Sequence, residues 1–165
     1  MASLITLGLS QIKVGTAAPD GVMPADGALT KIGATYQDSC KMTQAPAEVT
    51  EHFEEGVSAP KVRNKKKKMP ALVFSIMDPD PQVLADYIGG SNDAGVWGFN
   101  GDEIVANKAI RVEAKQGLWV DIPNADIEAV INSEFSEKGL FKVDFTVTPL
   151  AVSANKALKA YQKPA

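Results

Sequence analysis

The strongest constraint on the fold is a regular alternation of apolar and polar residues over the final third of the chain. Apolar side chains keep one parity over four successive segments, 104–114, 118–122, 125–135 and 141–147. A period of two places alternate side chains on opposite faces of a β-strand. Turn sequences at Gln116-Gly117 and Lys138-Gly139 separate the segments. The pattern therefore predicts four strands in an antiparallel meander, the last ending at Pro149.

One convincing helix lies in the middle of the chain, directly after an apolar strand. We expect the strand at 71–77, apolar on both faces and so central in its sheet. Asp80 can cap a helix that begins at Pro81, and Gly89 suits a left-handed C-cap. An apolar stripe at helical spacing is formed by Val83, Leu84, Tyr87 and Ile88. The sequence thus predicts a helix at about 80–88 that covers one face of a sheet and is needed for the fold.

The first half of the chain is less regular. Residues 4–14 predict a strand whose alternation changes phase, which indicates a bulge near Gly8 or Ser10. A long surface loop is expected at 15–31 because turn-forming residues cluster there. Short strands are expected at 33–36 and 49–53, followed by a polar loop at 56–68.

Two further segments complete the prediction. Residues 91–102 read as an irregular hairpin or loop around Trp97 and Phe99. The tail, 151–165, has weak helical character at 156–161, and we expect it to be mobile. The whole chain, 1–165, is expected to be a single, mainly β (α+β) domain: an antiparallel β-sandwich or a partly closed β-barrel with one packed helix and long loops.

Composition excludes several classes of protein. The net charge of −3 argues against a dedicated nucleic-acid binder. A single cysteine, Cys40, excludes an intrachain disulfide framework. No apolar run approaches the ~20 residues of a membrane span, so we expect no membrane partner. The first residues lack the pattern of a secretion signal, which favours a protein made in a cytoplasm.

No constellation of residues predicts an enzyme, a cofactor or a metal site. The only histidine, His52, lies in an acidic strand, and metal sites normally use several His or Cys ligands. Asp80 and its neighbours do not fit a calcium loop. Trp97 and Trp119 leave one alternative open, a β-sandwich binding module that stacks a sugar or holds a protein ligand.

The strongest charge feature is a run of four lysines, Lys65, Lys66, Lys67 and Lys68. Such a run belongs in solvent or opposite acidic groups. Three interpretations are open: a solvated loop, contact with DNA phosphates, or docking on an acidic patch of a neighbouring copy. The candidate residues for that acidic patch are Glu48, Glu51, Glu54 and Glu55. Net negative charge disfavours the DNA interpretation.

The order of these elements resembles the tail tube (major tail) proteins of bacteriophages and prophages. The resemblance runs from about Gly33 to Leu150 and is carried by the segments 72–76, 84–90, 109–112, 122–127, 135–140 and 146–150. It is a pattern of strands, one helix and turns. The resemblance implies a structural virion protein without catalytic, cofactor or metal residues.

What the resemblance implies about assembly is specific. Subunits of that family form hexameric rings that stack into a tube for DNA, and an extended loop commonly bridges neighbours. The expected partners are copies of the chain, tail proteins such as the tape measure and terminator, and transient, non-specific DNA in the lumen. The expected location is the virion tail. Another tail component or a secretion-system tube is the related alternative. The early loop 15–31 and the loop 56–68 are candidates for ring contacts. Two alternative sets of outward residues are candidates for the lumen: Asp126, Glu128 and Glu134, or Lys142 and Asp144.

Overall fold

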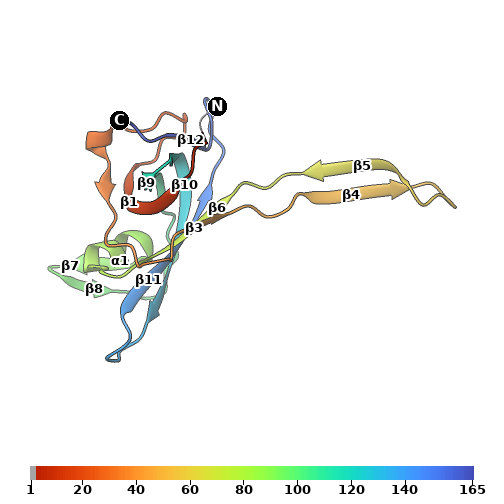
Figure 1. Ribbon diagram of the computed structural model, residues 1–165. Helices are drawn as coiled ribbons and strands as arrows, with labels where there is room; N and C mark the ends of the chain where they lie inside the picture. Colours follow the sequence, from red (N-terminus) through yellow and green to blue (C-terminus); the bar gives the residue numbers. More distant parts are fainter. Residues whose placement is uncertain (1–2) are drawn as a thin grey trace.

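The computed structural model describes residues 3–165, and an antiparallel sheet dominates it (Figure 1). The sheet has the order β2-β1-β9-β10-β11-β6-β3, and β12 pairs with the first part of β10. Its strands are β1 (Leu7–Thr16), β2 (Thr30–Lys31), β3 (Lys41–Thr43), β6 (Ala71–Ile76), β9 (Asn107–Gln116), β10 (Leu118–Ser133), β11 (Phe141–Pro149) and β12 (Lys159–Gln162). Among the described residues no pairing closes this sheet into a barrel. The expected mainly β, antiparallel fold with one helix is confirmed.

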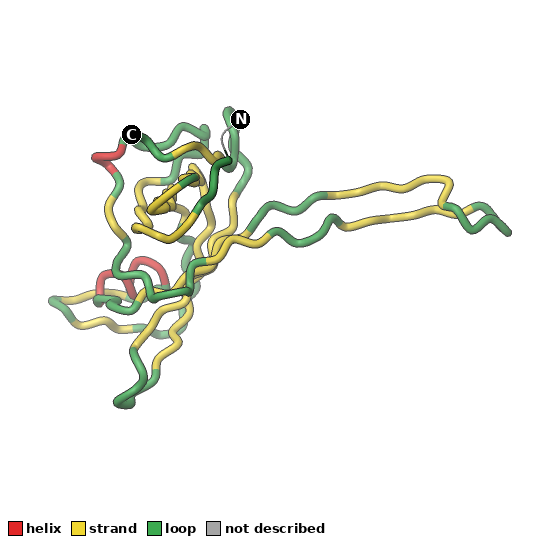
Figure 2. The backbone as a smooth tube through the Cα atoms, viewed as in Figure 1, coloured by secondary structure: helices red, strands yellow, loops and turns green. Residues whose placement is uncertain are grey.

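Two hairpins lie outside the main sheet. One pairs β4 (Glu48–Phe53) with β5 (Pro60–Lys66), and the other pairs β7 (Ser91–Asp93) with β8 (Val96–Gly98). The β4–β5 hairpin projects far from the rest of the molecule, whereas β7–β8 lies beside the helix (Figures 1 and 2). The hairpin predicted around Trp97 is therefore present.

The core lies between the inner face of the sheet and the helix α1 (Pro81–Tyr87). Phe145 is stacked on Phe74 with ring centroids 5.0 Å apart, and Tyr87 meets the same ring edge-on at 5.3 Å. Burial raises the pKa of Tyr87 to about 12. The fully buried aliphatic side chains include Ile12, Leu72, Ile76, Ile110, Ile122, Val143 and Val147. These are the residues that the period-two pattern placed on one face.

The helix has the predicted local chemistry. The Asp80 carboxylate accepts a hydrogen bond from the Val83 amide at 2.8 Å, and Pro81 occupies the first turn. Leu84 is buried, and Ile88 is the C-cap residue of the helix. Gly89 then adopts a φ of +119°, in the region that favours glycine. The turn leads into the β7–β8 hairpin, from which the Trp97 indole donates to the Gly89 carbonyl at 2.8 Å.

Several predicted boundaries were wrong in the second half of the chain. The segments predicted as two strands, 118–122 and 125–135, form one strand, β10, so the meander has three strands. Its register shifts between Ile122 and Ala125, where the buried Pro123 cannot donate to a ladder. The helical character expected at 156–161 is also wrong, because Lys159–Gln162 form β12 on β10.

The first half also departs from prediction. The strand expected at 33–36 is reduced to one bridge between Thr35 and Ile76. The Ala34 amide donates instead to the Asp78 carboxylate at 2.7 Å. The short edge strand β3 follows instead. It pairs with Ala71, Leu72 and Val73, so β6 lies next to the edge of the sheet, which is less central than expected. Val73 is exposed, so one face of β6 is not fully covered.

The remaining differences concern loops. The expected loop at 56–68 contains β5, and the loop at 15–31 contains the end of β1, a short 3₁₀ turn η1 (Asp26–Ala28) and β2. The bulge in β1 is confirmed, because the register shifts between Leu9 and Gln11.

Candidate functional site

The most unusual feature is the β4–β5 hairpin, residues 48–66, which we call the arm. Every residue of both strands is exposed. Within residues 3–165 these two strands pair only with each other. An isolated two-stranded hairpin is at best marginally stable in water, because it has no third strand or helix to cover either face. Among the described residues, the arm therefore depends on the pairing of its own two strands.

The arm holds most of the charged residues that sequence reasoning proposed for subunit contact. Lys65 and Lys66 lie in β5, with Lys67 and Lys68 at the base of the arm, and all four side chains are exposed. Glu48 faces Lys66 across the hairpin. The lysine run and the acidic patch are therefore neighbouring strands of one hairpin, a pairing that the sequence alone left open.

Two of the predicted acidic residues have partners within the arm. Glu51 forms an ion pair with Arg63 at 2.9 Å, and Glu54 forms one with Lys61 at 3.2 Å. Both pairs are well exposed, so their contribution to stability is small. The two pairs favour this register of the hairpin but add little to its free energy of folding.

The arm also carries apolar side chains in solvent. Phe53 is 56% exposed, and Val49, Val57 and Val62 are similarly open. Phe53 and Val57 flank the turn at the tip, where Gly56 has a φ of +78°. A monomeric protein rarely places such residues on an unsupported projection.

At the base of the arm the sheet forms a cleft of about 680 Å³. Strands β3 and β6, which lead into the arm, form one side of it, and β1, β9 and β10 contribute the rest. Its apolar lining consists of Leu9, Met42, Leu72, Val112, Leu118 and Val120. Lys31, Lys115 and Asp38 also line it, as does the half-buried thiol of Cys40. Burial raises the pKa of that thiol. Sequence reasoning missed this cleft because its walls come from segments far apart in the chain.

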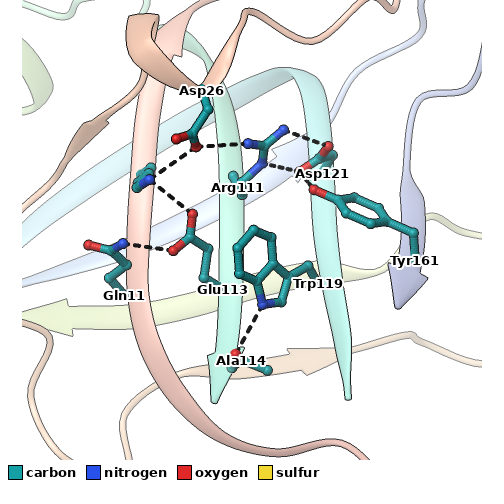
Figure 3. Close-up of polar contacts among 9 residues, drawn as sticks. Gln11, Asp26, Arg111, Glu113, Ala114, Trp119, Asp121 and Tyr161 are labelled. Atoms are coloured by element: carbon teal, nitrogen blue, oxygen red, sulfur yellow. Dashed lines mark hydrogen bonds and ion pairs between the residues drawn. The ribbon is translucent and has the colours of Figure 1, made fainter. Parts of the chain in front are cut away.

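A polar network covers the opposite side of β1, β9 and β10 (Figure 3). The Arg111 guanidinium pairs with the buried Asp121 carboxylate at 2.9 Å and with Asp26 at 3.1 Å. Lys13 connects Asp26 at 3.0 Å with the buried Glu113 at 3.1 Å. These pairs join the loop around η1 to three strands.

The charges of the network support one another. The hydrogen bond from Lys13 lowers the pKa of Asp26, and the same bond raises the pKa of Lys13. The hydrogen bonds to Asp121 raise the pKa of Arg111. Tyr161 of β12 donates to Asp121 at 3.3 Å, which ties the C-terminal strand to the network. The arrangement is a structural clamp that joins the loop around η1 and strand β12 to β1, β9 and β10.

The outer face of β10 and β11 carries the residues proposed for a lumen. Asp144 accepts hydrogen bonds from Ser75 at 2.5 Å and Asn132 at 2.9 Å. The Lys142 ammonium lies 4.5 Å from the centre of the Tyr36 ring. Asp126, Glu128 and Glu134 follow along β10 and its end, where Asp126 and Glu128 are exposed and Glu134 is in the turn region. This face is polar and not covered by another layer of the described chain.

The residues considered for chemistry stay apart. His52 is exposed on the arm, and the part of the chain that the structure describes contains no group of acidic, His or Cys residues able to hold a metal ion. Both tryptophans are engaged: Trp97 stacks on Phe99 with ring centroids 5.5 Å apart, and Trp119 donates to the Ala114 carbonyl at 3.0 Å. Within residues 3–165 no helix has the length and apolarity to cross a membrane.

Comparison with known proteins adds no family assignment. The sequence matches no protein-family model. No curated protein matches it significantly.

Proposed function

We propose that this chain is a structural virion protein, a tail tube subunit that assembles into stacked hexameric rings and forms a conduit for DNA. The observation that carries the proposal is the arm. It is a long hairpin with exposed apolar and charged residues and no support from its own chain. Such an element gains its packing only from a neighbour.

Open strand edges support the same proposal. The edge strand β3 is only three residues long, and its own outer edge pairs with no strand among residues 3–165. The second half of β10 pairs with β11 on one side, while its pairing with β9 ends at Asp126. Unpaired backbone groups at such edges are satisfied when the sheets of neighbouring copies join.

The outer face of β10 and β11 suits the lumen of such a tube. Asp126, Glu128, Glu134 and Asp144 outnumber Lys142 there. A predominantly acidic wall repels DNA phosphates, so DNA would move along it without binding. The tape measure and terminator proteins of a tail are the other partners that this function implies, and the virion tail is its location.

Negative-stain electron microscopy of the purified chain tests the proposal. We expect rings and tubes at high protein concentration, with a six-fold repeat in end views. Sedimentation velocity across a range of protein and salt concentrations provides the complementary measurement. A species that remains strictly monomeric throughout contradicts the proposal. A carbohydrate-binding module, the alternative, would instead show saturable sugar binding that Trp97→Ala or Trp119→Ala abolishes.

A further inference from the structure

We propose that the tip of the arm of one copy inserts into the cleft at the base of the arm of the next copy, with Phe53 as the anchor. The inference rests on the proposed self-assembly and specifies its contact. It follows from three properties of the tip and the cleft.

The first property is apolar complementarity. The tip presents Phe53 and Val57, two of the exposed apolar side chains of the arm. The cleft of about 680 Å³ is lined by apolar residues of five strands and lies within the size range of sites that bury a bulky group. A large aromatic residue in a central pocket is the usual energetic anchor of an interface.

The second property is charge. The turn carries Glu54 and Glu55, whereas Lys31 and Lys115 stand at the cleft against one acidic group, Asp38. Lys61 pairs with Glu54, so Lys61, Glu54 and Glu55 together give the tip one net negative charge, whereas Lys31, Lys115 and Asp38 give the cleft one net positive charge. Complementary charge at the margin of a contact favours the correct partner and speeds association.

The third property concerns an unsatisfied group. The hydroxyl of Thr35, which lines the cleft, is buried and has no hydrogen-bond partner among residues 3–165. Such an atom is costly to leave unpaired. An inserted backbone segment supplies the missing partner.

The positions of the two sites exclude a contact within one chain. Ten residues separate the end of β3 at Thr43 from Phe53, which spans roughly 30 Å in an extended chain. The arm projects away from the strands β1, β9 and β10, whose residues line the cleft (Figure 1). A tip that binds the cleft of a second copy makes a head-to-tail contact, and repeated contacts of this type produce rings or filaments.

Disulfide trapping tests this contact, because the cleft already contains the only cysteine of the chain, Cys40. In the variant Val57→Cys, which keeps the Phe53 anchor, oxidised glutathione at pH 8.5 should link the new thiol to Cys40 of the next copy. Non-reducing gels should then show a ladder of dimers and higher multimers that a reductant removes. A disulfide requires Cα atoms within about 7 Å, so random collisions give little product.

Two controls make the result specific. The double variant Val57→Cys, Cys40→Ser should lose the ladder above dimer. Val105→Cys, at an exposed position outside the arm, should give no ladder in the presence of Cys40. Alkylation of Cys40 with N-ethylmaleimide before assembly should block tube formation by the wild-type protein.

The outcomes separate this inference from the proposed function. If wild-type protein forms tubes but Val57→Cys gives no ladder and alkylated protein assembles normally, the inference is wrong and the tube proposal stands. If wild-type protein forms no tubes or rings but the Cys40-dependent ladder forms, the contact is right and the tube proposal is wrong.

Discussion

Two arginine–carboxylate pairs of equal length lie in very different surroundings. In the body of the protein, Arg111 Nε lies 2.9 Å from Asp121 Oδ1, with side chains 13% and 7% exposed. In the arm, Arg63 Nε lies 2.9 Å from Glu51 Oε1, with side chains 48% and 33% exposed. The chemistry is the same, but water screens only the second pair.

The difference extends to the whole of each region. The body buries stacked aromatic rings, a capped helix and a charged clamp, so its parts hold one another in place. The arm has two strands without a core. Residues of the body should therefore determine folding, and residues of the arm should determine association.

The largest effect is expected where the helix meets the core. Leu84→Asp removes a buried apolar side chain and places a carboxylate against the core. We expect a loss of at least about 5 kcal/mol in the free energy of unfolding, comparable with the whole stability of a domain. Circular dichroism and urea denaturation measure it. A soluble Leu84→Asp protein with a wild-type unfolding midpoint would show that the helix is placed wrongly, and Val96→Asp, at an exposed site, serves as the control.

A smaller loss is expected when the buried ion pair is broken. Asp121→Ala leaves the Arg111 guanidinium without its closest partner and removes the acceptor of Tyr161. We expect about 3 kcal/mol of destabilisation, measured by urea denaturation with the slope unchanged. An effect below about 1 kcal/mol would mean that this pair contributes no more to the free energy of unfolding than the Arg63–Glu51 pair of the arm does.

The matching substitution in the arm should matter little for folding. Glu51→Ala breaks a pair of the same length, and we expect less than about 1 kcal/mol of destabilisation. The same denaturation experiment provides the comparison. A loss equal to that of Asp121→Ala would mean that the arm is an integral part of the fold.

The smallest effect concerns Asp26, which is 65% exposed but lies between Lys13 and Arg111. The pKa of Asp26 is lowered from 3.8, chiefly by the hydrogen bond from Lys13. A carboxylate with a depressed pKa stabilises the fold above its unfolded value and loses that effect as the pH falls through its folded value. Asp26→Asn should therefore lower the melting temperature slightly at pH 5–8, and the difference should shrink as the pH falls below 3.8 and the carboxyl becomes protonated in the folded protein. A difference that persists at pH 2 would contradict this, and Asp102→Asn is the exposed control.

Sequence patterns predicted the parts of the fold that depend on local chemistry. Asp80 and Gly89 bound the helix because a cap and a left-handed turn need particular residues. Leu72, Phe74 and Ile76 share a buried face because a strand alternates. These features require no knowledge of distant segments.

The missed features depend on contacts between distant segments. Arg111 and Glu113 have the parity of a solvent-facing surface, yet a loop from the start of the chain covers them. Lys159–Gln162 became a strand because β10 offered an unpaired edge, which overrides weak helical preference. The apolar lining of the cleft comes from five strands. In the arm, the acidic and basic segments become neighbours only when β4 pairs with β5.

The central claim is that the arm serves association and not folding. Replacing residues 45–69 with an Asn-Gly turn should join β3 to β6 in a tight hairpin. The decisive measurement is sedimentation velocity of the wild-type and armless proteins at matched concentration, together with their urea midpoints. The account predicts rapidly sedimenting assemblies for the wild type and a monomer with an unchanged midpoint for the armless protein. Equal assembly of the two proteins, or an armless protein that fails to fold, would contradict it.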